Sequence, residues 1–297
     1  MNPYLKQYKW SNIFEMIRNL KAEPKTCAED FHQRLVVITG ATSGIGLAAA
    51  ETYAARGAEL VLINRSEKKS QELCAALRER FNARCTYILA DFSKRADVHS
   101  AARQLLALDK KIDVLIHNAG IYLTTRTITA DGMEAVFQTN YLSTFILNHY
   151  LKERFKAQGS GRILFVNSEA YRFAAAGLNL EDLSWEKHAY AGIKGYAAAK
   201  LAQLLSMLLW EEFFRGSGVT INAMHPGNIK TNSGQDNGWL YKKLKSLFID
   251  RSARPIQVAA EALYYLGASP EVAQVSGKFF NLTTIEEPAP PALDREA

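Results

Sequence analysis

Short runs rich in Val, Ile and Leu alternate with longer amphipathic stretches through most of this chain. The runs are almost continuously apolar, which is typical of strands buried on both faces of a sheet. We expect strands at 35–39, 59–64, 85–90, 112–117, 162–167 and 219–224, a seventh beginning at 278–280, and helices near 45–56, 67–82, 94–108, 131–157, 196–215 and 255–267. This alternation predicts an α/β fold: a doubly wound parallel sheet of about seven strands with helices on both faces.

The chain is long enough for one large domain with short additions at its ends. It has 297 residues, of which 48% are hydrophobic, and no linker or internal repeat divides it. We therefore predict a single main domain over residues 31–285, an N-terminal helical extension over 1–30 and a C-terminal tail over 286–297. The tail is rich in Pro and charged residues, and we expect it to be a surface strap or a loose end.

The N-terminal extension carries an apolar stripe at helical spacing, formed by Trp10, Ile13, Phe14, Ile17 and Leu20. Such a helix either packs on the main domain, or binds a membrane surface or a partner protein. Acidic residues such as Glu15 interrupt its basic face, which favours packing on the main domain.

The basic balance of the chain does not indicate nucleic-acid binding. The formal net charge is +6, but Lys and Arg are mixed with acidic residues along the chain, as on a solvated surface. Cys27, Cys74 and Cys85 show no zinc or disulfide pattern, so we expect reduced thiols, no metal site and a cytoplasmic protein. No run of about 18 apolar residues is present, so we expect no transmembrane helix.

A glycine-rich turn follows the first expected strand. The sequence TGATSGIG at 39–46 joins an apolar run to an amphipathic stretch. Glycine lets the backbone approach a phosphate closely, and the N-terminus of the next helix supplies free N–H groups and partial positive charge. We therefore predict a dinucleotide phosphate site formed by Gly40, Thr42, Ser43, Gly44, Ile45 and Gly46.

The residues after the second strand indicate which dinucleotide binds. An acidic residue there would accept a hydrogen bond from the ribose 2′-hydroxyl and favour NAD. This chain has Asn64, Arg65 and Ser66 instead, and a guanidinium can hold a 2′-phosphate in a fork. The sequence therefore predicts NADP(H) as the cofactor. Further cofactor contacts are expected after the third and fourth strands, from Asp91, Phe92, Asn118, Ala119 and Gly120.

A tyrosine and a lysine, Tyr196 and Lys200, lie four residues apart at the start of a strongly helix-forming run. About one helical turn separates them, so both side chains reach the same face. An ammonium beside a phenol favours the phenolate and moves the pKa of the phenol down from about 10. Such a group can give or take a proton at an alcohol or carbonyl oxygen, and with the dinucleotide site it suggests hydride transfer.

A second pair with the same spacing, Tyr190 and Lys194, precedes this one. Gly192 and Gly195 weaken a helix across that segment, so we assign the proton-transfer role to the later pair. Tyr190 is expected near the mouth of the pocket.

Taken in order, these motifs resemble the short-chain dehydrogenase/reductase family over about residues 34–281. The resemblance rests on the glycine turn, Asn118-Ala119-Gly120, Asn140, Ser168, the pair Tyr196 and Lys200, and Pro226, Gly227 and Thr231. It implies a Rossmann fold that binds NADP(H) within the domain 31–285. The segments TADGME at 129–134 and GKFF at 277–280 are similar to the retinol dehydrogenase-like branch, which is itself similar to protochlorophyllide reductases.

The resemblance also implies roles for individual residues. Tyr196 is the general acid/base at the substrate oxygen, and Lys200 lowers its pKa and holds the nicotinamide ribose. Ser168 orients and polarises the substrate oxygen, although a serine at a strand end can also simply cap local backbone. Asn140 supports a water that links Lys200 to solvent. After the sixth strand, the cofactor site is completed by Pro226, Gly227, Ile229 and Thr231.

Two segments, 170–191 and 232–252, are expected to form the substrate pocket. Glu169 either points away from this pocket or recognises a polar group of the substrate. A hydrophobic alcohol, ketone or aldehyde suits the aromatic residues that the two segments offer as walls, namely Trp185, Trp239, Tyr241 and Phe248.

The sequence thus predicts an NADP(H)-dependent alcohol dehydrogenase or carbonyl reductase, which would act as a reductase in a cell holding mostly NADPH. Two alternatives stay open: a non-catalytic NADP-sensing scaffold on the same fold, and a carbon–carbon double-bond reductase of the protochlorophyllide reductase type. The resemblance further implies a homodimer or homotetramer built through the long helices near 131–157 and 196–215. No nucleic-acid partner is expected.

Overall fold

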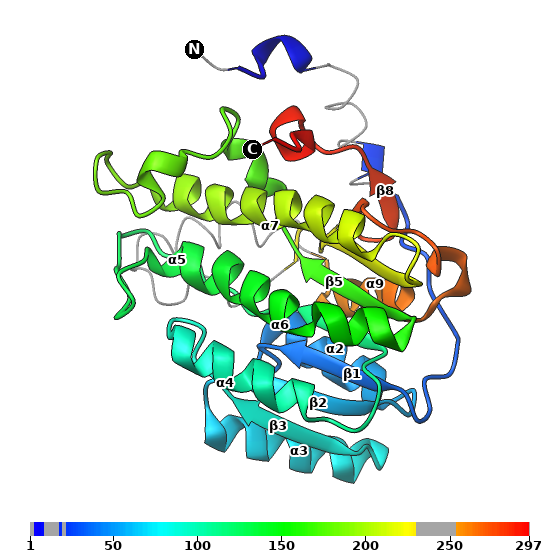
Figure 1. The fold of residues 1–297 in the computed structure, drawn as a ribbon. Coiled ribbons are helices and arrows are strands. Elements are labelled where there is room, and N and C mark those ends of the chain that lie inside the picture. Colours follow the sequence, from blue (N-terminus) through cyan, green and yellow to red (C-terminus); the bar gives the residue numbers. More distant parts are fainter. Residues whose placement is uncertain (1–2, 9–17, 20–21, 230–253, 297) are drawn as a thin grey trace.

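The computed structural model describes residues 3–8, 18–19, 22–229 and 254–296. These residues form one eight-stranded sheet with the order β3-β2-β1-β4-β5-β6-β7-β8 (Figure 1). All neighbouring strands are parallel except β8, which is antiparallel to β7. The predicted doubly wound α/β fold is confirmed, with one short strand more than expected. The strands are β1 (Leu35–Thr39), β2 (Glu59–Asn64), β3 (Cys85–Leu89), β4 (Val114–His117), β5 (Gly161–Val166), β6 (Val219–His225), β7 (Phe279–Asn281) and β8 (Thr284–Glu286).

Two layers of helices cover the sheet because successive strand residues point to opposite faces. In β1, Val36 and Ile38 enter one core, and Leu35 and Val37 enter the other. The first core lies under α2 (Gly44–Ala54), α3 (Glu67–Phe81) and α9 (Ile256–Ala268). The second lies under α4 (Arg95–Leu106), α6 (Ser143–Gln158) and α7 (Gly192–Phe214), which form the front layer of Figure 1.

Helix α7 begins at Gly192, four residues before the predicted start at 196. A Cβ on Gly192 would lie 2.4 Å from the carbonyl oxygen of Leu123, and a Cβ on Gly195 would lie 2.7 Å from the ring of Tyr190. Both glycines therefore permit close packing at the first helical turn. Although the two glycines were expected to weaken a helix here, α7 contains both of them, and Tyr190 lies outside α7, before the N-cap residue Ala191.

The single helix expected over 131–157 is divided into three parts. The short helix α5 (Ala135–Phe137) continues into a π-helical turn (Gln138–Leu142) and then into α6. Glu134 fixes the start of α5, because its carboxylate accepts hydrogen bonds from the N–H groups of Val136 at 3.0 Å and Phe137 at 2.8 Å. π-Helical turns are frequent at functional sites, and this one carries the fully buried Asn140.

The C-terminal segment packs against the main domain. The tail was predicted to begin at residue 286, but Glu286 is the last residue of strand β8 and so belongs to the sheet. Farther on, the N–H of the buried Ala289 donates to the Tyr171 hydroxyl at 2.8 Å. The Tyr4 hydroxyl donates to Asp294 at 2.7 Å, which places the two ends of the described chain side by side above α7 (Figure 1). The apolar stripe predicted in the N-terminal extension, from 10 to 20, lies outside the described residues.

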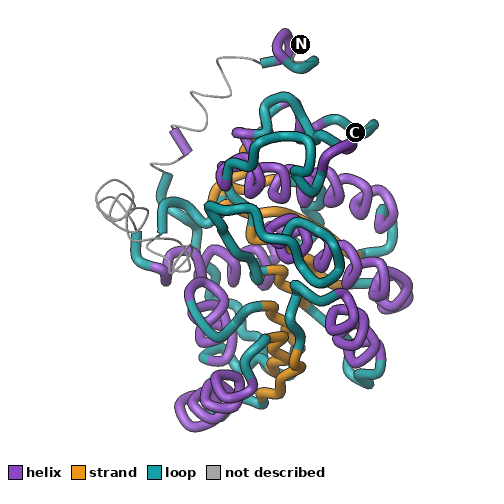
Figure 2. The backbone as a smooth tube through the Cα atoms, turned by 90° about the vertical axis from the view of Figure 1, so that its left-hand side faces the viewer, coloured by secondary structure: helices purple, strands orange, loops and turns teal. Residues whose placement is uncertain are grey.

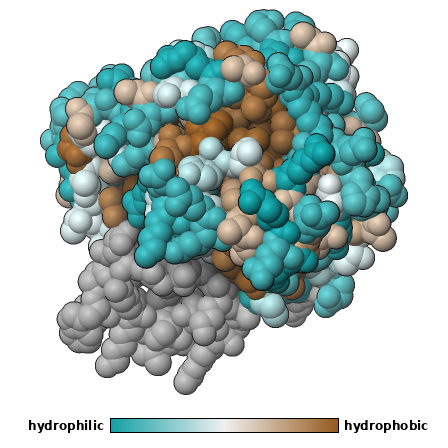
Figure 3. Space-filling view, turned by 90° about the horizontal axis from the view of Figure 1, so that it is seen from below, coloured by the Kyte–Doolittle hydropathy of each residue, from teal (hydrophilic) through white to brown (hydrophobic). Residues whose placement is uncertain are grey.

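Figure 3 shows the surface from below Figure 1, where α3 and the edge strand β3 lie. Hydrophilic residues dominate this face, and hydrophobic atoms gather mainly in one hollow that hydrophilic residues surround. Within the described ranges, no helix is long and apolar enough to cross a bilayer.

Candidate active site

Except for the antiparallel β8, the strands in Figure 1 point toward one end of the sheet, and Figure 2 faces this end. A cleft of about 700 Å³ opens there, at the carboxyl ends where doubly wound folds bind their ligands. Most of the predicted site residues line this cleft: Gly40, Thr42, Ser43, Gly44, Ile45, Asn64, Arg65, Ser66, Asp91, Phe92, Asn118, Ala119, Gly120, Ser168, Tyr196, Lys200, Pro226, Gly227 and Ile229.

Two predicted residues of the described chain, Gly46 and Asn140, do not line the cleft. Gly46 lies in the first turn of α2, behind the glycine turn. Asn140 lies in the π-helical turn, behind the residues that line the cleft. Thr231 lies outside the described residues, as does the expected pocket segment 232–252 with its three aromatic residues.

The glycine turn is shaped for close approach of a ligand. Gly40 and Gly44 have positive φ angles of 68° and 60°, which glycine adopts without strain. A Cβ on Gly46 would lie 2.4 Å from both the Asn118 side chain and the Gly40 carbonyl oxygen, so α2 can begin here only with glycine. The side chain of Ser43 makes no capping bond, which leaves the first N–H groups of α2 without a partner in the helix. The turn therefore has the space and the donors that the pyrophosphate of a dinucleotide needs.

At the end of β2 the cleft has a basic rim. Asn64 is buried and used internally, since its Oδ1 accepts from the Ala41 N–H at 2.8 Å and its Nδ2 donates to Ser70 at 3.1 Å. Arg65 and Lys69 line the cleft beside it, and the acidic group among the described lining residues is Asp91, which follows the neighbouring strand β3. Asp91 accepts from Ser93, and despite partial burial these bonds hold the pKa of its carboxyl below the usual value. The ribose end of the cleft therefore favours an anion.

Thr39, the last residue of β1, joins the glycine turn to the loop after β4. Its Oγ1 accepts from the N–H groups of Asn118 and Ala119, each at 3.0 Å. The Asn118 Nδ2 donates in return to the carbonyls of Thr39 at 3.0 Å and Gly40 at 2.9 Å. Asn140 fixes the following residue, Ile121, by accepting from its N–H at 2.8 Å and donating to its carbonyl at 2.9 Å. The loop after β4 is thus held rigidly beside the glycine turn.

The predicted proton-transfer residues converge on the deep part of the cleft. Tyr196 and Lys200 lie one turn apart on α7, with the Lys200 Nζ 5.7 Å from the centre of the Tyr196 ring. Burial of Lys200, which is 4% exposed, lowers its pKa from 10.5 to about 7. Tyr122, after β4, packs edge-on against the Tyr196 ring at 5.5 Å. Ser168 lines the same cleft and also caps local backbone, since its Oγ accepts from the Ala170 N–H at 3.2 Å.

The alternative pair is not arranged for this chemistry. Tyr190 does not line the cleft, and its hydroxyl lies against the Leu123 carbonyl at 3.3 Å and the buried Glu134 carboxylate at 3.2 Å. Burial raises the pKa of both Tyr190 and Glu134. Tyr190 therefore connects the loop before α7 to the start of α5, away from the cleft.

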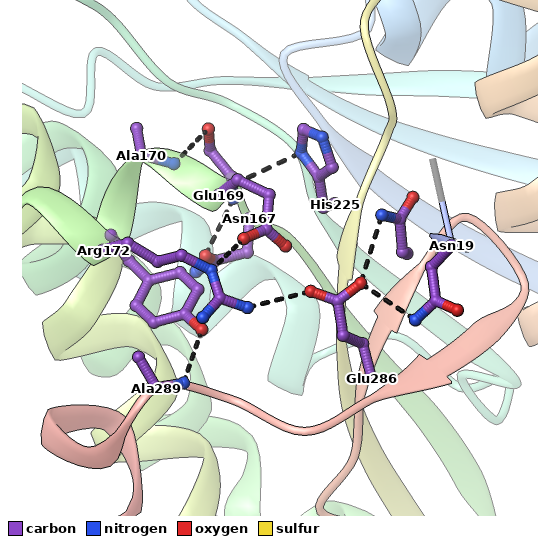
Figure 4. A network of polar contacts seen from close by, with 11 residues as sticks. Asn19, Asn167, Glu169, Ala170, Arg172, His225, Glu286 and Ala289 are labelled. Atoms are coloured by element: carbon purple, nitrogen blue, oxygen red, sulfur yellow. Dashed lines mark hydrogen bonds and ion pairs between the residues drawn. The ribbon is translucent and has the colours of Figure 1, made fainter. Parts of the chain in front are cut away.

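Glu169 points away from the cleft into a buried polar network (Figure 4). Its carboxylate pairs with Arg172, which also donates to the buried Glu286 at 2.9 Å. Asn281 and Asn19 donate to the second oxygen of Glu286, at 3.3 and 3.1 Å. The structure therefore supports the first of the two possibilities for Glu169, namely that its side chain points away from the substrate pocket.

The Glu169 carboxyl gives a testable pH dependence. Burial and the nearby Glu286 carboxylate raise its pKa from 4.5 to about 7, although the Arg172 guanidinium acts in the opposite direction. Between these pH values the folded protein binds more protons than the unfolded chain, so this group lowers the free energy of unfolding as pH rises. Glu169→Gln should remove that decline, as measured by urea unfolding at about pH 5 and about pH 8. Glu287→Gln, at an exposed neighbour of Glu286, serves as control and should keep it.

Sequence reasoning missed several residues that line the cleft, namely Lys69, Tyr122, Thr139, His225 and Asn228. Lys69 had a detectable signal, because it lies in the first turn of the helix expected over 67–82, shortly after Arg65. His225 ends β6, and its Nδ1 accepts from the Glu169 N–H at 3.4 Å. Tyr122 follows the strand by five residues, with no local pattern that places it in the cleft.

Comparison with known proteins agrees with this geometry. The profile of the family described as short chain dehydrogenase matches residues 34–180. Retinol dehydrogenase 13 from Mus musculus is 31% identical over 268 residues, which cover 89% of this chain and 80% of the mouse protein. The chloroplastic short-chain dehydrogenase TIC 32 A from Brassica napus is 32% identical over 92% of this chain and 88% of its own length.

Solved structures show the same fold. A protein of Mycobacterium Paratuberculosis, 27% identical, superposes with a TM-score of 0.71 over 92% of both chains. A short-chain dehydrogenase from Sphingobium yanoikuyae in complex with NADPH, 25% identical, superposes with a TM-score of 0.63 over 78% of this chain and 83% of its own. The identity over most of the length, the fold and the cleft lead to one conclusion: the chain belongs to the short-chain dehydrogenase/reductase family and is retinol dehydrogenase-like.

Proposed function

We propose that this protein is an NADP(H)-dependent oxidoreductase that interconverts a hydrophobic alcohol and the corresponding ketone or aldehyde. The observation that carries the proposal is the convergence of Tyr196, Lys200 and Ser168 in a cleft with a glycine turn at its other end. The NADPH complex of the Sphingobium yanoikuyae relative and the retinol dehydrogenases among the relatives support the choice of cofactor and substrate class.

The bound nicotinamide would supply or accept the hydride. The turn from Gly40 to Gly46 and the first N–H groups of α2 would bind the pyrophosphate of the dinucleotide. The rigid loop after β4 would lie along the same cofactor. Arg65, with Lys69 beside it, would bind a 2′-phosphate. These residues hold the cofactor from the two sides of the cleft.

The proton chemistry falls to side chains of the chain itself. In the reduction direction the Tyr196 hydroxyl donates a proton to the substrate oxygen, and in the oxidation direction it accepts one. The Ser168 hydroxyl donates a hydrogen bond to the same oxygen and thereby orients it. The charged Lys200 ammonium makes the Tyr196 phenol a stronger acid, since it stabilises the phenolate.

Beside Tyr196 the cleft is lined by Ile121 and Tyr122, which supports an apolar or aromatic substrate. The three cysteines are buried and free, which supports a reducing compartment such as the cytoplasm. A dimer or tetramer through the helices over 131–157 and 196–215 stays a prediction.

The function is tested with a panel of hydrophobic aldehydes and ketones, among them all-trans-retinal and phenanthrenequinone, with nicotinamide absorbance as the readout. We expect NADPH to be consumed with formation of the matching alcohol. Tight NADPH binding without turnover of any compound would instead favour the scaffold, and a saturated product that keeps its carbonyl would favour a double-bond reductase.

Cofactor choice is tested by Arg65→Ala. Removing the guanidinium should weaken NADP binding roughly tenfold or more, because a charged hydrogen bond contributes about 1.5–3 kcal/mol. NAD binding should change little, since it has no 2′-phosphate to lose a partner. Fluorescence titration with NADPH and NADH measures both affinities. Arg84→Ala, at the exposed amino end of β3, is the control and should change neither. Tighter binding of NAD than NADP by the unmodified protein would contradict the proposal.

A further inference from the structure

Lys200 is a buried cation held by neutral oxygen atoms. Its Nζ donates to the Val166 carbonyl at 2.8 Å and to the Gln203 Oε1 at 3.1 Å. Burial alone lowers its pKa, with no charged group of the described chain contributing. The position of this ammonium beside Tyr196 therefore depends on two uncharged acceptors.

Gln203 is a fully buried amide that contacts three elements at once. Its Oε1 accepts from the Lys200 ammonium and from the Asn167 Nδ2, each at 3.1 Å, and its Nε2 donates to the Asn140 carbonyl at 2.7 Å. A reversed amide would place its NH₂ against two donors and its oxygen against a carbonyl, so these contacts permit a single orientation. An apolar side chain of the same size would leave the Asn140 oxygen and the Asn167 amide without this partner.

Asn167 extends the connection to the predicted substrate-orienting serine. Its Oδ1 accepts from the Ser168 N–H at 2.8 Å, and its Nδ2 donates to the Lys200 carbonyl at 3.0 Å as well as to Gln203. Asn167 is itself buried at the end of β5. Two amides therefore join the strand end that carries Ser168 to the helical turn that carries Lys200.

The other end of the connection is the π-helical turn. The family resemblance implies a water at Asn140 that links Lys200 to solvent, and in the structure the Gln203 amide joins these two residues. A neutral amide neither gives up nor takes a proton near neutral pH, so Gln203 serves to hold atoms in place. It does not line the cleft and acts through Lys200.

We propose that Gln203 is the positioning residue of the proton-transfer pair Tyr196 and Lys200, holding the ammonium between the Asn140 turn and the Ser168 strand end. The inference rests on the proposed oxidoreductase function and adds to it a residue outside the cleft. Gln203→Glu keeps the shape and adds a negative charge, and Gln203→Met keeps the volume and removes the acceptor. The two changes should act on Lys200 in opposite directions.

The first test uses the protein without cofactor. The pKa of Lys200 is about 7 in the folded protein and 10.5 for an ordinary lysine. Between these pH values the folded protein therefore binds fewer protons than the unfolded chain. Stability should therefore rise with pH across that window. A carboxylate at position 203 raises the pKa of Lys200 and reduces the rise, whereas loss of the acceptor lowers it and enlarges the rise. Urea unfolding at several pH values from about 5 to 10 measures this.

Other titratable groups surround Lys200 and are common to all variants. Tyr196 precedes it on α7, Tyr122 follows β4, and His225 ends β6; all three line the cleft. Burial lowers the pKa of His225 to about 4, outside the window. Glu169 pairs with Arg172, away from the ammonium. Comparison between variants therefore isolates the effect at Lys200.

The second test is the pH profile of kcat with NADPH and all-trans-retinal or phenanthrenequinone. Activity should fall as pH rises past the pKa of Lys200, because the neutral amine no longer supports the Tyr196 phenolate. This limb should move up by about one pH unit in Gln203→Glu and down in Gln203→Met. In Gln203→Met, kcat should also fall on the order of 10²-fold, as expected for a misplacement of about 1 Å.

Leu204→Met is the matched control. Leu204 is the next residue of α7 and is fully buried in the core, and methionine replaces it with an apolar side chain of similar volume. It should move neither measurement. If Gln203→Glu and Gln203→Met fail to shift stability and the kcat limb in opposite directions while Tyr196→Phe is inactive, the inference alone is overturned. If Tyr196→Phe is fully active, the proposed function itself is wrong, whatever the position 203 variants do to stability.

Discussion

Tyr196→Phe is expected to lower kcat for carbonyl reduction by a factor on the order of 10³, within the range by which general acid/base groups accelerate reactions. Phenylalanine keeps the ring that packs edge-on against Tyr122 but has no proton to give to the substrate oxygen. The fold and the glycine turn are untouched, so NADPH affinity should stay close to that of the unmodified protein. Steady-state kinetics and a fluorescence titration of NADPH measure the two quantities separately.

Tyr190→Phe is the matched control, because it removes the same hydroxyl from the other tyrosine of the same spacing. The loss leaves Glu134 without its bond from Tyr190 and should reduce the free energy of unfolding by about 1–3 kcal/mol. Its kcat should remain near that of the unmodified protein, because Tyr190 does not line the cleft. An inactive Tyr190→Phe with an active Tyr196→Phe would move the proton-transfer role to the earlier tyrosine.

The strands could be located from the sequence because burial on both faces demands nearly continuous apolar runs. The predicted bounds 35–39 and 59–64 agree with β1 and β2 to the residue, since polar or glycine residues end both runs. The start of α7 could not be predicted in this way. Gly192 and Gly195 have low helix propensity, and only the approach of Leu123 and Tyr190 explains why the helix contains them.

The site shows the same division between local and distant information. Tyr196 and Lys200 are linked by helical spacing, which is visible in the sequence. Glu169 and Glu286 are far apart along the chain and come together around Arg172 only once the sheet has formed. Sequence spacing carries no information about such a pairing, so the role of Glu169 stayed open until its partners were known.

Arg172→Met is expected to reduce the free energy of unfolding by about 3 kcal/mol, the lower end of the range for removing one partner from a buried ion pair. Arg172 is the cation between two acidic groups, and the Glu286 side chain is fully buried. Methionine keeps much of the volume that packs on the Tyr171 ring but leaves Glu286 to two neutral amides, those of Asn19 and Asn281. Urea unfolding near neutral pH measures the loss.

Arg215→Met supplies the control, because the Arg215–Glu211 pair has a similar 2.9 Å contact but an exposed arginine. Its loss should be much smaller than that of Arg172→Met, because solvent screens surface ion pairs. Combining Arg172→Met with Glu169→Gln and Glu286→Gln removes the buried negative charges together with their partner, so much of the lost stability should return. If the triple variant is as unstable as Arg172→Met alone, lost packing rather than unpaired charge accounts for the effect, and the network is not held together electrostatically.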